Sequence, residues 1–142
     1  MLEKDAPQVA EMAAELSAHE GVPPPPFDAE KIMRFGFGSE RYFEGLVVEL
    51  AGQTVAYALY HTSFHVGRGT PGLFMMDLFV RTHARRQGIA RALMKKLGEI
   101  CRERGGDWIT WQAAANNVDA LSFYEALGAR RYRAADFELL VD

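Results

Sequence analysis

The sequence predicts an α/β fold, in which a mixed and mostly antiparallel central sheet is flanked by helices. Two observations predict it. Several β-branched and aromatic runs follow one another in the first half of the chain, which favours antiparallel pairing. After Gly88, helical and strand-like segments alternate instead, which favours parallel pairing. With 142 residues, 49% hydrophobic and 25% charged, residues 1–142 are expected to form a single domain.

Two helices are predicted ahead of the first strand. Asp5 is placed to cap the first, with a proline in its first turn and Gln8 able to reach back to the cap, and Gly21 ends it. A stiff connector, Pro23–Pro26, separates it from a shorter helix over Asp28–Phe35.

Six stretches have strand composition. The first two are separated by Ala51-Gly52-Gln53, a spacing that predicts a hairpin. The third is apolar along nearly all of its length, which predicts burial on both faces. The stretches are Leu46–Leu50, Thr54–Thr62, Leu73–Val80, Trp108–Gln112, Arg131–Arg133 and Phe137–Val141.

Two more helices follow the third strand. Apolar residues from Ile89 to Cys101 recur on one face of a segment that ends at Gly105-Gly106. The second helix spans Asn117–Leu127 and is closed by Gly128. Cys101 belongs to the apolar face of the first of these helices, so we interpret it as a core residue.

The turn that leads into the long helix is a candidate anion site. Gly88 and the small Ala90 allow a ligand to approach the backbone, and the N–H groups that open a helix attract phosphate. Arg85, Arg86 and Arg91 add positive charge. A simple helix start with solvated arginines is the alternative. The turn has neither the P-loop spacing nor the Rossmann glycine spacing.

Three blocks in this order resemble the GNAT superfamily of N-acetyltransferases, over about Leu46 to Tyr132. Within it, the blocks are most similar to the branch of diamine and thialysine acetyltransferases. The blocks are Met76–Val80, Arg85–Ala90, and Asn117 with Phe123–Ala129. Similar proteins usually begin with a short strand, but no strand-like run precedes Asp5, so by this resemblance the first strand is expected to be missing.

This resemblance implies a binding site for acetyl-coenzyme A. The backbone of Arg86–Ala90 is expected to hold the pyrophosphate, and main-chain groups of Leu78 and Val80 to pair with the pantetheine arm like an added strand. The cofactor-binding residues expected are Leu78, Phe79, Val80, Arg85, Arg86, Gln87, Gly88, Ile89, Ala90, Arg91, Asn117 and Tyr124.

Asn117 and Tyr124 are two helical turns apart, which places them on one face of a helix. In similar enzymes the matching asparagine contacts the pantetheine arm, and the matching tyrosine protonates the leaving thiolate. We carry both roles over, with Tyr124 as the general acid. The alternative is structural: Asn117 as a helix cap and Tyr124 as a core aromatic.

The general base is where the sequence departs from its nearest-looking relatives. Diamine acetyltransferases carry a glutamate where this chain has Met76, which cannot accept a proton. Asp77 remains as a catalytic candidate, although strand alternation would point it away from Met76. Glu44, His61, His65 or a chain of water molecules are the other candidates.

Composition excludes several other classes. A net charge of -3 is unlike that of nucleic-acid-binding domains, and the chain shows neither a membrane-spanning run nor a signal peptide. The single cysteine cannot form an internal disulfide, so a cytoplasmic location is expected. The four histidines lack metal-ligand spacing, and no metal is predicted.

The sequence therefore predicts a cytoplasmic enzyme that transfers acetyl from acetyl-coenzyme A to a primary amine of a small molecule. By the resemblance, it is expected to act as a homodimer. Two alternatives remain open. One is an enzyme that acetylates protein lysine or N-terminal amines, and the other is a coenzyme A-binding sensor that has lost turnover.

Overall fold

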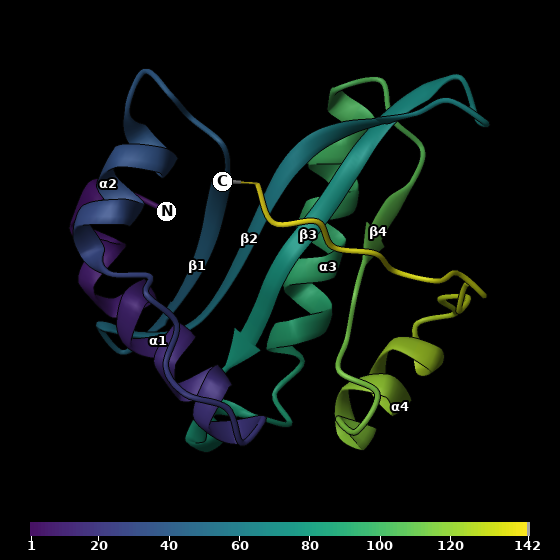
Figure 1. The fold of residues 1–142 in the computed structure, drawn as a ribbon. Helices are drawn as coiled ribbons and strands as arrows, with labels where there is room; N and C mark the ends of the chain where they lie inside the picture. The colour runs from purple at the N-terminus through teal and green to yellow at the C-terminus, as the bar shows by residue number, and fades with distance from the viewer. Residues whose placement is uncertain (142) are drawn as a thin grey trace. The chain divides into compact units, whose positions relative to one another are not determined.

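The computed structural model describes residues 1–141, which form two compact units, Met1–Gln112 and a second that begins at Ala113. Figure 1 shows the elements in chain order. The first unit contains η1 (Glu3–Asp5), α1 (Ala6–His19), α2 (Ala29–Phe37), β1 (Glu44–Leu50), β2 (Gln53–His65), β3 (Thr70–Val80), η2 (Thr82–Ala84), α3 (Ile89–Glu103) and β4 (Ile109–Trp111). The second unit contains α4 (Val118–Ala126).

The two predicted N-terminal helices are confirmed, but the first begins differently from the expectation. Asp5 does not cap α1 with its side chain, because its Oδ2 accepts a hydrogen bond from the backbone N–H of Leu2 at 2.6 Å. Gln8 does not reach back to the cap, and its side chain contacts Glu11 and Arg81 instead. Asp28 does cap α2, accepting from the N–H of Lys31 at 2.9 Å. Within residues 1–141, no strand precedes α1.

The four strands form one sheet in the order β1-β2-β3-β4. β1–β2 and β2–β3 are antiparallel, whereas β3–β4 is parallel, so the predicted mixed sheet is confirmed. The predicted hairpin is also present: Leu50 pairs with Gln53 across Ala51 and Gly52. Both turn residues have positive φ, 51° and 80°, as a two-residue turn between twisted strands requires.

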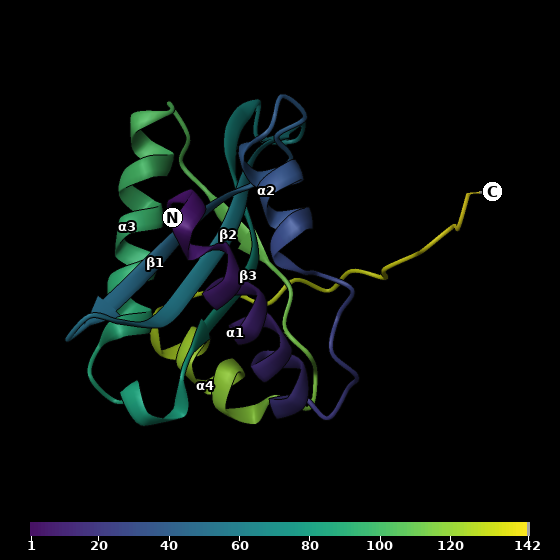
Figure 2. The same cartoon turned by 90° about the vertical axis from the view of Figure 1, so that its left-hand side faces the viewer.

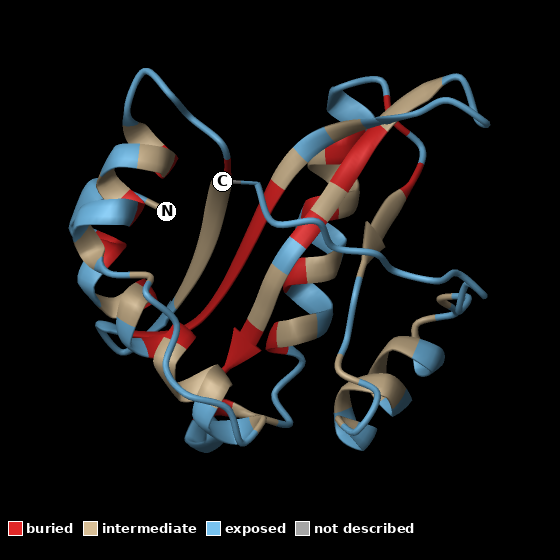
Figure 3. Cartoon of the chain, viewed as in Figure 1, coloured by how far each residue is buried: buried red, intermediate tan, exposed pale blue. Residues whose placement is uncertain are grey.

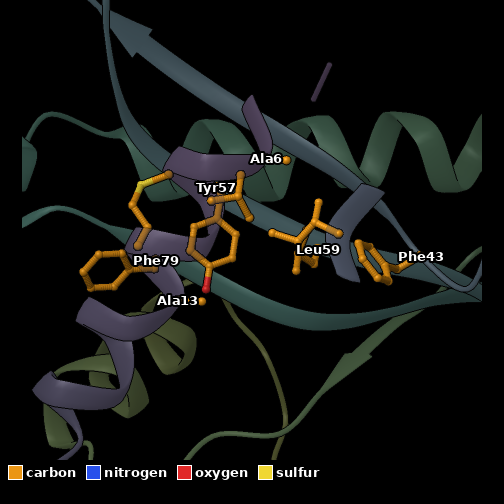
Figure 4. Close-up of a cluster of buried hydrophobic side chains, with 9 residues drawn as sticks. Ala6, Ala13, Phe43, Tyr57, Leu59 and Phe79 are labelled. Carbon is orange, nitrogen blue, oxygen red and sulfur yellow. The ribbon is translucent and has the colours of Figure 1, made fainter. Parts of the chain in front are cut away.

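Helices cover both faces of this sheet. Figure 2 shows α3 on one face and α1 with α2 on the other. Buried residues follow β2, β3 and the inner sides of α1, α2 and α3 (Figure 3). Figure 4 shows part of the core beneath α1 and α2. This core consists of Ala6, Val9, Met12, Ala13, Ile32, Phe43, Tyr57, Leu59 and Phe79.

The two C-terminal strand predictions are wrong for this structure. Residues 131–133 and 137–141 belong to no helix or strand. A strand is stabilised by its ladder partners, and among the described residues no ladder includes these segments. Their β-branched and aromatic content is therefore insufficient by itself, and Phe137 is 96% exposed.

The junction between β3 and β4 depends on the absence of a side chain at Gly72. The indole of Trp108, the residue that precedes β4, lies over this glycine, and a Cβ there would overlap the ring. Trp108 also donates its indole N–H to the carbonyl of Thr70 at 3.1 Å, and its own carbonyl accepts from the N–H of Leu73 at 3.0 Å. These contacts align the start of β4 with β3.

Gly72→Ala should therefore destabilise the chain by about 3 kcal/mol, because the added Cβ would clash with the ring and with the Trp108 carbonyl, 2.6 Å away, and hydrogen bonds hold both groups in place. The matched control is Gly98→Ala within α3, where an added Cβ meets only the end of the Arg102 side chain at 3.6 Å. The control should gain roughly 0.5 to 1 kcal/mol from helix propensity. Urea unfolding measures both, and equal effects would contradict the packing role of Gly72.

Candidate functional site

One edge of β3 has no partner strand over its second half. β3 pairs with β4 at Leu73, Phe74 and Met75, and no pairing on that side is found beyond them within the described residues. The N–H of Arg81 donates to the carbonyl of Val55 at 2.8 Å, which shows which way the backbone faces. Because alternate residues of a strand direct their polar groups to opposite edges, the N–H and C=O groups of Leu78 and Val80 face the open edge.

Phe79 lies between these two residues, and its backbone faces the opposite edge of β3. It pairs with Tyr57 on β2, and its side chain is part of the core cluster. Of the three strand residues predicted to bind cofactor, Leu78 and Val80 present backbone groups to the open edge. Phe79 presents neither its backbone nor its side chain there.

A β-bulge interrupts β3 at Met76. Leu59 pairs with Asp77 and Tyr60 pairs with Met75, so Met76 is an extra residue with no partner on β2. The regular alternation that underlay the sequence prediction for Asp77 therefore does not hold here. Asp77 lies on the face of the sheet that carries Tyr57, to which it is hydrogen-bonded, and Met76 is 42% exposed.

The turn after β3 has the backbone geometry of an anion site. Arg86 and Gly88 have φ values of +63° and +76°, and Gly88 is the residue immediately before α3. Among residues 1–141, no backbone acceptor bonds the N–H groups of residues 86–91. Successive N–H groups in such a turn form a concave nest, and an added Cβ at Gly88 would meet nothing within 4 Å. The turn is therefore open to a phosphate.

The three arginines of this turn are not equivalent. Arg86 and Arg91 are exposed, as a contact with a phosphate group requires. Arg85 instead donates its Nε–H to the carbonyl of Val80 at 2.9 Å, and its guanidinium lies 5.6 Å from the centre of the Phe79 ring. Arg85 thus caps one of the backbone groups at the open edge of β3.

The carboxylate of Asp77 is held by a buried tyrosine. The hydroxyl of Tyr57 donates to Asp77 Oδ2 at 2.9 Å. Burial raises the pKa of Asp77 above its usual range, the hydrogen bond from Tyr57 opposes this, and the negative charge of Glu20 adds to it. Sequence reasoning missed Tyr57 and Glu20, because only the strand register and the end of α1 bring them to Asp77.

The other candidate bases are engaged elsewhere. Glu44 accepts two hydrogen bonds from the guanidinium of Arg104, at 2.7 and 2.9 Å, and these lower the pKa of its carboxyl. His61 Nδ1 lies 3.1 Å from the carbonyl of Thr62. His65 Nδ1 accepts from the N–H of Arg68 at 3.1 Å. A carboxylate held by an arginine is a weak proton acceptor, so the geometry favours Asp77 over Glu44.

Acidic residues of α1 hold the end of β3. Arg81 Nη2 lies 3.3 Å from Glu11 Oε1 and donates to Gln8 Oε1 at 3.1 Å. Arg81 Nε lies 3.3 Å from Glu15 Oε1. The Nε contact lacks hydrogen-bond geometry, so it is an ion pair alone. Glu11 and Glu15 therefore tie α1 to the residue that precedes the turn.

The second unit contains the remaining predicted residues. Asn117 is the N-cap of α4, and its Oδ1 accepts from the N–H of Ala120 at 3.2 Å. The capping role that the sequence left open is thus present, and the side-chain NH₂ of Asn117 still carries two donors. Tyr124 lies within α4, with its ring 5.4 Å from that of Phe123.

A sequence model of the acetyltransferase (GNAT) family matches residues 10–129. The chain belongs to this family. It is also similar to proteins named thialysine N-epsilon-acetyltransferase. The one from Bos taurus is 26% identical over 94% of this chain and 84% of its own length. The one from Caenorhabditis elegans is 37% identical over 56% of this chain and 46% of its own length.

Solved acetyltransferases share the fold of this GNAT protein. An aminoglycoside acetyltransferase from an uncultured soil metagenomic sample has a TM-score of 0.80 at 20% identity, covering 100% of this chain and 93% of the other. A ribosomal-protein-alanine N-acetyltransferase from Brucella melitensis has a TM-score of 0.71 at 21% identity, covering 100% and 94%. The chain is an acetyl-coenzyme A-dependent N-acetyltransferase. None of its helices within residues 1–141 has the length and apolarity to cross a membrane.

The two held carboxylates should show opposite effects on stability. The pKa of Asp77 is raised by burial, so its charged form costs stability at neutral pH, and Asp77→Asn should raise Tm there. This gain should vanish as the pH falls below the usual aspartate pKa of about 4.

The pKa of Glu44 is lowered by Arg104, so Glu44→Gln should reduce Tm at neutral pH and lose its effect in acid. Thermal unfolding of both variants between acid and neutral pH measures the two effects. A lower Tm for Asp77→Asn at neutral pH would contradict the burial cost assigned to Asp77.

Proposed function

We propose that this GNAT protein transfers acetyl from acetyl-coenzyme A to a primary amine of a small molecule. One observation carries the proposal: the open edge of β3 leads directly into a turn whose N–H groups have no backbone acceptor within residues 1–141. An extended, hydrogen-bonding arm with a diphosphate at one end matches this sequence of backbone groups. Coenzyme A has that chemistry.

The residues of the first unit divide the binding between them. In our proposal the N–H groups of Gln87–Ala90 hold the pyrophosphate, and Arg86 and Arg91 add positive charge. The carbonyl of Leu78 and the backbone groups of Val80 pair with the pantetheine arm, which leaves the N–H of Leu78 for the thioester carbonyl. The carbonyl of Val80 already accepts from Arg85, so its second lone pair is the one available to the arm. The proposal keeps for Asn117 the role that the resemblance implies, a contact with the pantetheine arm.

The transfer itself needs no covalent enzyme intermediate. The acceptor nitrogen attacks the carbonyl carbon of the thioester, the C–S bond breaks, and the amine proton passes to Asp77. We propose that the N–H of Leu78 polarises the carbonyl oxygen and that Tyr124 gives its proton to the leaving thiolate. The pKa of Asp77, raised by burial, suits it to accept a proton better than a solvated aspartate would.

The acceptor is proposed to be a cationic small molecule. The relatives over most of the chain are named for thialysine, an amine of that class. The negative charges of Asp77 and Glu20 on the α1 face of β3 favour a cation. A cytoplasmic location and a homodimer complete the proposal.

Gly88→Glu should abolish binding of acetyl-coenzyme A, because it places a negative side chain in the nest. At a ligand concentration 100 times Kd, the wild type should gain about 2.7 kcal/mol of stability, measured as a rise in Tm. Gly105→Glu is the matched control, since it adds the same charge at a glycine with φ +78° and open space at the other end of α3. It should keep the ligand-dependent rise in Tm. If Gly88→Glu keeps it too, the pyrophosphate binds elsewhere.

Turnover against a panel of diamines, lysine analogues and lysine peptides tests the reaction and its acceptor. Tyr124→Phe should lower kcat by roughly 100-fold with little change in the Kd of acetyl-coenzyme A, because a general acid acts in the transition state. Tyr42→Phe, which removes an exposed hydroxyl, is the control. A rate preference for peptides would favour a protein acetyltransferase, and binding without turnover would favour a sensor.

A further inference from the structure

Tyr57 lies in the middle of the core, and its hydroxyl makes a hydrogen bond there. Its side chain is 0% exposed. Figure 4 shows its ring among the core side chains, with the hydroxyl oxygen at one end. That hydroxyl donates to Asp77 Oδ2 across the β2–β3 pair. A buried phenol needs such a partner, so the hydrogen bond couples the core to Asp77.

The packing around Tyr57 makes it a rigid donor. Its ring centre lies 6.4 Å from that of Phe79, and both belong to the cluster covered by α1. The strand register fixes the geometry as well, because Tyr57 pairs with Phe79 and Leu59 pairs with Asp77. The hydroxyl therefore approaches Asp77 from a fixed direction.

Asp77 keeps one oxygen available. Within residues 1–141 its hydrogen bond is the one from Tyr57 to Oδ2. Asp77 is partly exposed, and among the described residues its Oδ1 is not one of the fully buried side-chain atoms that lack a hydrogen-bond partner, so this oxygen is not sealed in the core. The carboxylate is thus held on one side and open on the other.

We propose that Tyr57 is a positioning residue for acetyl transfer, which holds Asp77 through Oδ2 and leaves Oδ1 to accept the proton of the acceptor amine. This inference rests on the proposed function, in which Asp77 is the base. It adds a residue that does not touch the substrate and acts through Asp77 alone.

The electrostatic surroundings support this role. Burial raises the pKa of Tyr57 far above its usual range, so the hydroxyl stays protonated and remains a donor at any working pH. The titratable groups that act on Asp77 are Tyr57 from β2 and Glu20 from α1, and they shift its pKa in opposite directions. Removing the hydroxyl of Tyr57 and removing the charge of Glu20 should therefore shift the pKa of Asp77 in opposite directions.

The test measures the Asp77 carboxyl directly, by ¹³C NMR titration of the full chain. Tyr57→Phe should raise the pKa of Asp77, because the ionised form loses its donor. Glu20→Gln should lower it, because a like charge is removed. Tyr60→Phe, which removes a hydroxyl from a buried tyrosine of β2 that does not contact Asp77, should leave it unchanged. An Asp77 titration that does not respond to Tyr57→Phe overturns the inference.

A second replacement at position 57 keeps the test valid if the Tyr57→Phe variant fails to fold. Incorporating 3-fluorotyrosine at position 57 keeps nearly the same volume and strengthens the donor. It should lower the pKa of Asp77. No change from this replacement would also overturn the inference.

Kinetics then separate this inference from the proposed function. Tyr57→Phe should lower kcat/KM at neutral pH by about 10-fold and move the acid limb of its pH profile to higher pH, since the base must be ionised. In an Asp77→Asn background, Tyr57→Phe should have no further effect on the rate. An additive loss there, or an unshifted acid limb, would overturn the positioning role. Failure of the proposed function shows differently, as a wild type without turnover on any amine.

Discussion

The parting of β3 from β4 is the constraint on which the rest of the site depends. The two strands are joined at Leu73–Met75, where Trp108 lies over Gly72 and bonds the backbone on both sides. Beyond this point β3 stays paired with β2 as far as Val80, but within residues 1–141 no strand pairs with its other edge. Backbone groups that would cost free energy if buried unpaired are thus left for a ligand to satisfy. The binding edge is a consequence of where the pairing stops.

The same strand serves three purposes on three sides. Its open edge presents Leu78 and Val80, its α1 face carries Asp77 and the core residue Phe79, and its end leads into the left-handed turn at Arg86. One strand can do all three because the ligand is bound through backbone N–H and C=O groups. The side chains of β3 then remain available for the core and for Asp77. The bulge at Met76 adds a residue in the middle of β3, so the register changes between the half that pairs with β4 and the half that does not.

Local features of this chain were predictable from sequence, and cross-strand features were not. The β1–β2 hairpin and the helix start after Gly88 depend on turn residues a few positions apart, and both are present. The bulge at Met76 and the Tyr57–Asp77 bond depend on register between distant segments, which composition does not encode. The C-terminal strands failed for a related reason: propensity identified strand-like residues but no partner for them.

The bulge at Met76 changes which residue of β3 is suited to act as the general base. Met76 has no ladder partner on β2, a bulge directs its side chains differently from a regular strand, and methionine brings no proton acceptor to this position. Asp77 is the next residue, and it lies in the regular ladder with a rigid donor behind it. Burial makes its charge costly and Glu20 adds to that cost, yet the same effects bring its proton affinity closer to that of a useful base. Stability is thus reduced at the residue where the proposed chemistry needs a proton acceptor, as in other sites that retain unfavourable electrostatics for function.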